Sequence, residues 1–294
     1  MRVSLFVLAA VLAAFPVVPA SGESWQMDIE ANLTLTQSAY SQNWVGGEAG
    51  SASWTLNSNW LAKKQVHPLA RTKNTLKLAF GQTHSQATES RHWAGPVKST
   101  DLIDLESVLH FTLGGFVDPF AAARVESQFF DNSDSEKDRY LNPVTLTESL
   151  GITKVFIKEE KREWSARLGA ALRQHLNRDA LNEVTLRRED EFSDDGGLEF
   201  VSDLKTPLAE DRITLSSKLI VFQALFYSKS DELKGLPEEG YWKSADVNWE
   251  NIFTASVTKY LMVSLYVQFL YDKQVALGGR LKQSLSMGVT YKLM

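Results

Sequence analysis

The stretch GSASWTLNSNW, residues 50–60, alternates between two kinds of side chain. Ala52, Trp54, Leu56 and Trp60 share one parity, and the other parity holds only small polar residues: Ser51, Ser53, Thr55, Asn57 and Asn59. Because successive side chains of a β-strand point to opposite faces, we predict a strand here with one apolar face and one small polar face.

The same alternation recurs along the whole chain. It is clear in residues 27–37, 74–83, 101–113, 163–175 and 259–273, and weaker near 120–131, 143–157, 195–204, 210–228, 242–257 and 280–293. With residues 50–60 these segments make twelve predicted strands, an even number.

The predicted connections fall into two classes. Short links lie near 63–71, 113–120, 157–161, 204–210 and 257–261, and longer ones near 38–50, 84–100, 131–143, 175–195 and 228–242, with a brief last link near 273–280. Because long and short links alternate, an up-and-down meander would place every tight turn at one end and the long loops at the other.

The polarity of the side chains on the two faces distinguishes two kinds of closed barrel. A soluble barrel of the lipocalin type fills its interior with apolar side chains, whereas a membrane barrel has an apolar outer band and a polar lumen. Here the polar parity mixes charged with small residues, and the apolar parity carries almost no charge, as lipid contact requires. Aromatic residues expected near strand ends fit interfacial belts: Trp54, Trp60, Trp164 and Tyr291. We therefore predict an all-β fold, a transmembrane antiparallel up-and-down β-barrel of twelve strands.

The first residues have the layout of a secretory signal peptide. Arg2 precedes an apolar stretch from Val3 to Phe15, Pro16 follows, and small residues stand near Ala20 and Gly22. A single anchoring helix is the alternative, but the apolar stretch is shorter than the ~20 residues that span a bilayer. We expect residues 1–22 to be the signal peptide and residues 23–294 to form the barrel, exported to the bacterial outer membrane with its N-terminus on the periplasmic side.

Composition excludes several other classes of protein. The 294 residues carry a formal net charge of −5 without a long basic run, so no nucleic-acid partner is predicted. Cysteine is absent, which rules out a lipoprotein anchor, disulfides and thiolate metal sites. No cofactor or metal site is predicted, and the oligomeric state stays open.

The C-terminal strand has the form of the signal that the outer-membrane barrel assembly machinery reads. Ser286 and Gly288 are polar or small, and Tyr291 and Leu293 follow as alternating apolar residues. The chain departs from the usual pattern because Met294, and not an aromatic residue, stands last. The expected partners are therefore this machinery and outer-membrane lipid.

Several blocks together resemble an uncharacterised bacterial family, domain of unknown function 3078. They include LTLTQSAYSQNWVGGEAGSASW, NTLKLAFGQTH, STDLIDLESV, VDPFAAARVESQF, LNPVTLTESLGI, RLGAALRQH, DVNWENIFT and LYVQFLYDK. The resemblance implies an outer-membrane β-barrel and assigns no substrate or catalytic residue.

Charged residues of both signs lie on the polar parity. We group them as a predicted lumen charge network: Asp104, Glu106, Arg124, Glu126, Arg167, Arg173 and Asp272. Mixed signs predict ion pairs between strands, because one buried charge alone is costly. The network is interpreted either as structural or as a charged constriction that selects solutes.

The five histidines suggest little chemistry. His67, His84 and His92 fall in or beside predicted connections, and His110 and His175 lie on the polar parity of different strands. The last two could act as a base beside a hydroxyl group, or simply hydrogen-bond in the lumen. No catalytic residue is assigned.

A glycine-rich stretch and two acidic stretches are candidates for ligand binding. Residues 43–50, NWVGGEAG, form a glycine turn without the Gly-Lys-Ser/Thr ending of a phosphate loop. The acidic stretches SDSEKD and RREDEFSDDGG lack the spacing of an EF-hand, and solvated surface is the preferred interpretation.

Three functional classes follow. The preferred one is a porin-like channel for small solutes. The alternatives are a non-conducting structural or adhesion barrel with an ion-paired lumen, and an outer-membrane enzyme that modifies lipid with His110 or His175 as base.

Overall fold

A computed structural model describes residues 24–40, 49–87, 90, 92–134, 136–182, 187–258 and 260–292. The predicted signal peptide, most of the glycine turn at 43–50, and Leu293 lie outside these residues. No helix within the described ranges is long and apolar enough to cross a membrane.

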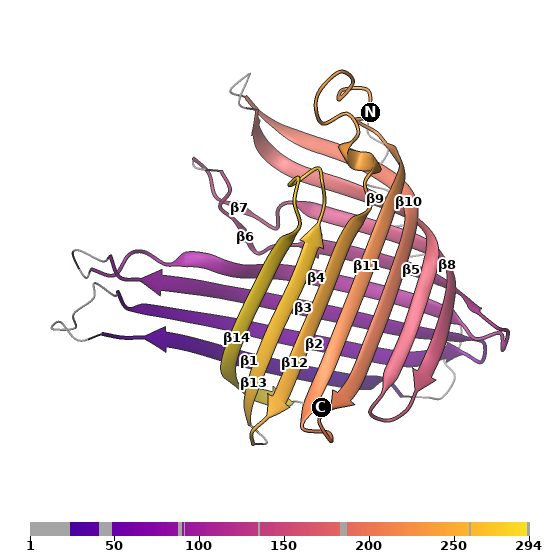
Figure 1. The fold of residues 1–294 in the computed structure, drawn as a ribbon. Helices are drawn as coiled ribbons and strands as arrows, with labels where there is room; N and C mark the ends of the chain where they lie inside the picture. The colour runs from indigo at the N-terminus through magenta and orange to yellow at the C-terminus, as the bar shows by residue number, and fades with distance from the viewer. Residues whose placement is uncertain are drawn as a thin grey trace.

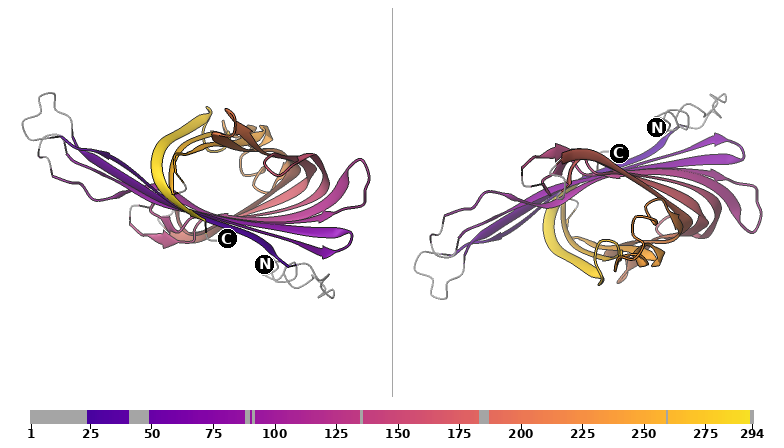
Figure 2. Two further views of the ribbon diagram at one scale, coloured as in Figure 1. Left: turned by 90° about the horizontal axis from the view of Figure 1, so that it is seen from below. Right: turned by 90° about the horizontal axis from the view of Figure 1, so that it is seen from above.

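Twelve antiparallel strands close into one barrel (Figures 1 and 2). They are β1 (Gln26–Ser38), β2 (Ser51–His67), β3 (Ala70–Ser85), β4 (Val97–Phe111), β5 (Asp118–Ser127), β8 (Val144–Lys158), β9 (Glu163–Asn182), β10 (Arg187–Leu208), β11 (Ile213–Tyr227), β12 (Asp246–Ser256), β13 (Leu261–Tyr271) and β14 (Arg280–Lys292). Each strand pairs with its neighbour in this order, and β1 pairs with β14. Closure leaves no free edge in the sheet, as a spanning sheet requires.

The two classes of connection lie at opposite ends of the barrel. The connections that follow β2, β4, β8, β10 and β12 lie at one end, which we call the turn end. The connections that follow β1, β3, β5, β9, β11 and β13 lie at the other, which we call the loop end. The predicted count of twelve strands is therefore confirmed. The predicted alternation of long and short connections fails after β9, because β9 ends at Asn182 and β10 begins at Arg187. Figure 1 shows β11–β14 in front, crossing β1–β4 behind at a steep angle, and Figure 2 shows the continuous ring seen along the barrel.

One predicted loop is wrong. Residues 175–182 and 187–195 belong to the far ends of β9 and β10, which pair from Arg187–Asn182 down through Ser193–His175. With 20 and 22 residues these strands are about twice the length that spans a bilayer. Their polar sequence looks like a loop because both faces of the extended hairpin lie beyond the apolar band. In Figure 1 the ends of β9 and β10 rise above the rest of the wall.

The loop between β5 and β8 is fastened to that extended hairpin. It contains the short strands β6 (Phe130–Asp131) and β7 (Arg139–Tyr140). Buried Asn142 donates to Asp131 at 3.0 Å and to Asn177 at 2.8 Å, and Arg188 of β10 binds Asp134 at 2.6 Å. These contacts hold the loop against β9 and β10.

The outer face of the wall is apolar. Five residues from different strands around the ring are 46–65 % exposed: Leu56, Leu105, Leu168, Trp249 and Leu285. Such a band is the face that a membrane barrel turns to lipid. Of the predicted belt residues, Trp164 and Tyr291 lie near the turn end and Trp54 near the loop end, whereas Trp60 lies nearer the middle of β2.

The inner face is polar and small. Buried Asn32, Thr147, Ser149, Thr153 and Thr290 face the lumen. Gly151 and Gly169 stand opposite each other across β8 and β9, where a Cβ on either would meet a backbone carbonyl of the other strand. These two strands therefore approach as closely as they do because neither has a side chain at this point.

The opening stretch follows the predicted parity. Leu56 and Trp60 are exposed on the outer face, and Asn57 pairs with buried Ala79. In the last strand Met287, Val289 and Tyr291 are exposed, and Gly288 and Thr290 are buried.

Candidate functional site

A tier of ion pairs lies inside the barrel at mid-height. Arg124 of β5 donates to Asp104 of β4 through Nε at 2.8 Å and Nη2 at 3.0 Å, and reaches Glu126 at 2.9 Å. Asp104 is 5 % exposed, so this forked pair is screened from bulk water. Asp104 and Glu126 are direct partners in the β4–β5 ladder, as are Glu106 and Arg124, so these four side chains lie on the same face of the wall.

Glu106 is the centre of the tier. Its Oε1 accepts from Arg167 of β9, and its Oε2 accepts from Lys218 of β11 at 2.9 Å. On the shorter way round the sheet, β5 and β8 lie between β4 and β9. Four strands, β5, β8, β9 and β10, lie between β4 and β11. The contact between Glu106 and Lys218 therefore crosses the lumen.

A second contact also crosses the lumen. Lys77 of β3 binds Glu250 of β12 at 2.6 Å, and Tyr266 of β13 hydrogen-bonds the same carboxylate. The shorter way from β3 to β12 passes through β2, β1, β14 and β13. Two lysines thus span the interior at mid-height.

A further cluster lies nearer the loop end. Arg173 binds Asp195 through Nε at 2.9 Å and Nη2 at 2.5 Å, binds Asp246 at 2.7 Å, and lies over the Phe222 ring at 3.6 Å. Trp242, from the 3-10 turn η1 (Tyr241–Lys243), packs on the cluster of Ala171, Phe222 and Ala224. The loop between β11 and β12 therefore folds inward at this end.

The structure places six of the seven residues grouped from sequence in these two clusters. Asp272 differs: it follows β13 in a turn, accepts from the backbone N–H of Gln274 at 2.9 Å, and makes no ion pair within the described chain. The sequence grouping missed several partners, namely Lys77, Asp195, Lys218, Asp246 and Glu250. Each lies on the polar parity of its strand, but the contacts across the lumen depend on the curvature of the ring.

The two lumen histidines have different surroundings. His175 lies 3.1 Å from the Thr145 hydroxyl through Nδ1, and its Nε2 is 3.8 Å from Asp195. His110 pairs across the ladder with Arg71 and lines a cavity beside Arg167. A hydroxyl, an imidazole and a carboxylate stand in the order of a catalytic triad at His175. The distance from Nε2 to Asp195 exceeds hydrogen-bond reach, however, so the triad is not formed.

The acidic stretches named from sequence are occupied by basic partners. Asp134 and Glu136 both contact Arg188, and Lys137 contacts Asp179. These carboxylates fasten the β5–β8 loop to the extended hairpin.

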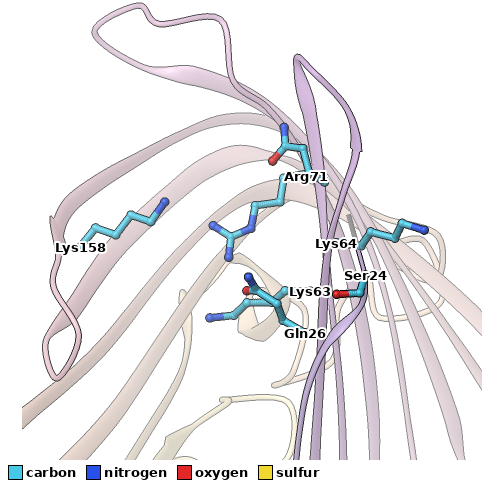
Figure 3. A pocket seen from close by; sticks show the side chains of 7 residues that line it. Ser24, Gln26, Lys63, Lys64, Arg71 and Lys158 are labelled. Carbon is cyan, nitrogen blue, oxygen red and sulfur yellow. The ribbon is translucent and has the colours of Figure 1, made fainter. Parts of the chain in front are cut away.

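Two cavities open toward the turn end. The outer one has a volume of about 260 Å³ and is shown in Figure 3; the deeper one, of about 170 Å³, extends to Glu106 and Arg167. Lys63, Arg71 and Lys158 line both. The interior on this side therefore runs from the turn end up to the tier of ion pairs.

Part of the chain matches a known protein family. The sequence model of the family described as protein of unknown function (DUF3078) matches residues 35–132, which confirms the resemblance over that part of the chain. No curated protein matches the sequence.

Among solved structures, an outer membrane channel from Pseudomonas putida F1 is similar, with 14 % identity, 95 % of this chain and 97 % of that chain covered, and a TM-score of 0.41. The translocator domain of the autotransporter NalP from Neisseria meningitidis has 10 % identity, coverages of 97 % and 94 %, and a TM-score of 0.37. Pseudomonas putida OprB has 10 % identity, coverages of 91 % and 93 %, and a TM-score of 0.27. The fold rests on the strand pairing described above.

Proposed function

We propose that the protein is an outer-membrane barrel that conducts small solutes through a narrow, charged passage. The turn end would face the periplasm and the loop end the outside, since short periplasmic turns and longer external loops are the usual arrangement. Export by a signal peptide and insertion by the barrel assembly machinery belong to the same proposal.

One observation supports a passage more than any other. The lumen is crossed at mid-height by lysine side chains, at Lys77–Glu250 and Lys218–Glu106, and not by backbone. Long ammonium side chains can exchange partners with water and ions, so opposed charges around a narrow lumen form a selective constriction. The cavities on the turn side lead up to this level.

A closed structural barrel is the second candidate. The same crossing pairs, together with Trp242 packed at the loop end, would support it if they hold the lumen shut. The lipid-modifying enzyme has less support. His110 and His175 lie on the lumen-facing parity, whereas the acyl chains of a lipid would lie outside the wall.

Planar-bilayer recording separates these candidates. The protein is purified in detergent and reconstituted beside a variant in which Lys77 and Lys218 are both changed to alanine. We expect discrete conductance steps from the wild type and larger steps from the variant. A silent wild type with a conducting variant would select the closed barrel, and silence from both would exclude the channel.

Two further measurements test the remaining parts. Cell fractionation should place the protein with the outer membrane, and a chain that stays soluble and monomeric without detergent would overturn that location. Lipid hydrolysis that disappears in His175→Ala, with the barrel intact, would favour the enzyme.

A further inference from the structure

The turn end of the lumen carries an excess of positive charge. The outer cavity is lined by Ser24, Gln26, Lys63, Lys64, Gln65, Arg71 and Lys158, a set that contains four cations and no carboxylate. Figure 3 shows Lys63, Arg71 and Lys158 reaching into one space from different strands, with Gln26 beside Lys63, while Lys64 points away from it.

The strand register places like charges against each other here. Lys63 of β2 is the direct partner of Lys73 of β3, and Gln65 is the direct partner of Arg71. Like charges directly opposite in an antiparallel pair destabilise the sheet, because their Cβ atoms lie only about 5 Å apart. Lys73 lines the deeper cavity, so the two lysines charge adjoining spaces.

Internal compensation for this charge is small. Lys63 approaches Glu163 at 3.5 Å, and half of the Glu163 side chain is exposed. Arg71, Lys73 and Lys158 make no ion pair with any residue that the structure describes. The deeper cavity also contains four carboxylates. Glu106 is bound by Arg167 and Lys218. Asp118, Glu163 and Asp203 lie on β5, β9 and β10, and Asp118 accepts from the backbone of Leu113 at 2.8 Å.

We propose that this space binds a small polyvalent oxyanion from solution, such as a phosphate or a polycarboxylate. Arg71 supplies a planar fork suited to two oxygens, Lys63 and Lys158 supply single donors from other strands, and Gln26 offers an uncharged amide. Lys73 adds charge from the deeper side. The volume of about 260 Å³ admits only a small solute. The proposal names the class of solute for the proposed channel. Transport of the anion rests on that proposed function, whereas binding of the anion does not.

Binding can be measured without any conduction. Equilibrium dialysis in a nonionic detergent at fixed ionic strength uses radiolabelled inorganic pyrophosphate as the probe. We expect saturable binding of one anion per barrel, weakened about tenfold in Arg71→Gln and in Lys158→Gln, as loss of one charge-assisted contact implies. Lys161→Gln removes an equal charge from an exposed turn residue that binds Asp211 and lines neither cavity, so this variant should bind like the wild type.

A gain of affinity provides a test that misfolding cannot imitate. Glu163→Gln removes the carboxylate that competes for Lys63, so binding should tighten severalfold. Phosphatidylglycerol micelles at equal phosphate concentration should fail to displace the probe; displacement would assign the site to a lipid headgroup and overturn a dissolved anion.

The failures of the two proposals are distinguishable. Binding by a barrel that is silent in bilayers would retain the anion site and remove the channel. Conduction by a barrel that binds no pyrophosphate, or that loses equal affinity in Lys161→Gln and Lys158→Gln, would retain the channel and remove the site.

Discussion

Lys218 of β11 lies 2.9 Å from Glu106 of β4, although four strands separate them on the shorter way round the sheet. Glu106 also holds Arg167, so one carboxylate neutralises cations from two other parts of the wall. The width available at mid-height is therefore set by side chains, and single substitutions can change it.

Shortening the side chain at position 218 should widen the lumen at mid-height. Lys218→Ala removes the long side chain from the lumen while Arg167 continues to neutralise Glu106, so we expect larger single-channel conductance. Lys161→Ala is the control. Lys161 is an exposed turn residue, and it binds Asp211 outside the lumen. Equal conductance in all three proteins would contradict a constriction at Lys218.

Removing the shared carboxylate should destabilise the barrel. Glu106→Gln removes the ion-pair partner of Arg167 and Lys218 in a site where Arg167 is 6 % exposed. Breaking a buried pair by deleting one partner costs about 3–5 kcal/mol of unfolding free energy. Urea unfolding in lipid vesicles, followed by tryptophan fluorescence, measures this loss. The double variant with Arg167→Gln should lose less than the sum of the single changes, and strict additivity would argue against the contact.

The β8–β9 pair should not tolerate a side chain at Gly169. Its Cβ would meet the backbone carbonyl of Leu150, so the strands must separate. We expect Gly169→Val to cost about 1–3 kcal/mol, the range for overpacked sites. The neighbouring Ala170→Val adds similar bulk on the exposed outer face and should be nearly neutral in the same urea experiment. A larger loss from Ala170→Val would refute the explanation.

A serine on the outer face should stabilise the wall through an indole. Trp249 Nε1 donates to Ser217 Oγ at 3.1 Å, and Trp249 is about half exposed on the outer face. In lipid the indole N–H finds no water, so Ser217→Ala should cost about 1–3 kcal/mol. Because Ser217 also donates to Asn251, the cycle with Trp249→Phe is required. A coupling energy near zero in that cycle would show that the indole contact contributes nothing.

Acid should loosen the β5–β8 loop. Hydrogen bonding from Arg188 lowers the pKa of Asp134 to about 2, below the ordinary value for an aspartate. A carboxyl group whose folded pKa is depressed contributes stability above its unfolded pKa, and loses it as pH falls from about 4 toward 2. Amide exchange corrected for intrinsic rates should show protection at Glu136, whose N–H donates to Asp134, declining in that window.

Asp134→Asn is the control for the acid effect. It should reduce protection at Glu136 at neutral pH and remove the step between pH 4 and 2. An unchanged step in the variant would assign the transition to another carboxyl group.

The sequence was sufficient for the fold because the barrel repeats one local rule. Most strands alternate with period two, and most long and short connections alternate with them, so the twelve strands could be predicted without knowing any contact. The hairpin end of β9 and β10 escaped this rule. Beyond the apolar band both faces meet water, so alternation disappears although the backbone ladder continues.

The charged interior was only partly predictable. Asp104 and Arg124 are on adjacent strands, and local register suggests their contact. Lys77 and Glu250 are 173 residues apart in the chain and meet only through the curvature of the closed ring. Asp272 shows the converse error, because a residue one position past a strand end leaves the parity pattern and caps a turn.

The seam between β1 and β14 constrains how the molecule can be made. Six residue pairs, from Glu30–Lys292 to Leu35–Met287, join the first strand to the last, fewer than the thirteen that join β1 to β2. A ribosome delivers these two strands at opposite ends of synthesis, so the ring cannot close while translation proceeds, and every earlier intermediate has two unpaired borders. Such an intermediate must be kept apart from its copies until the last strand arrives. Among the described residues the β1–β14 ladder is the shortest in the wall, so the finished ring should part here first under load.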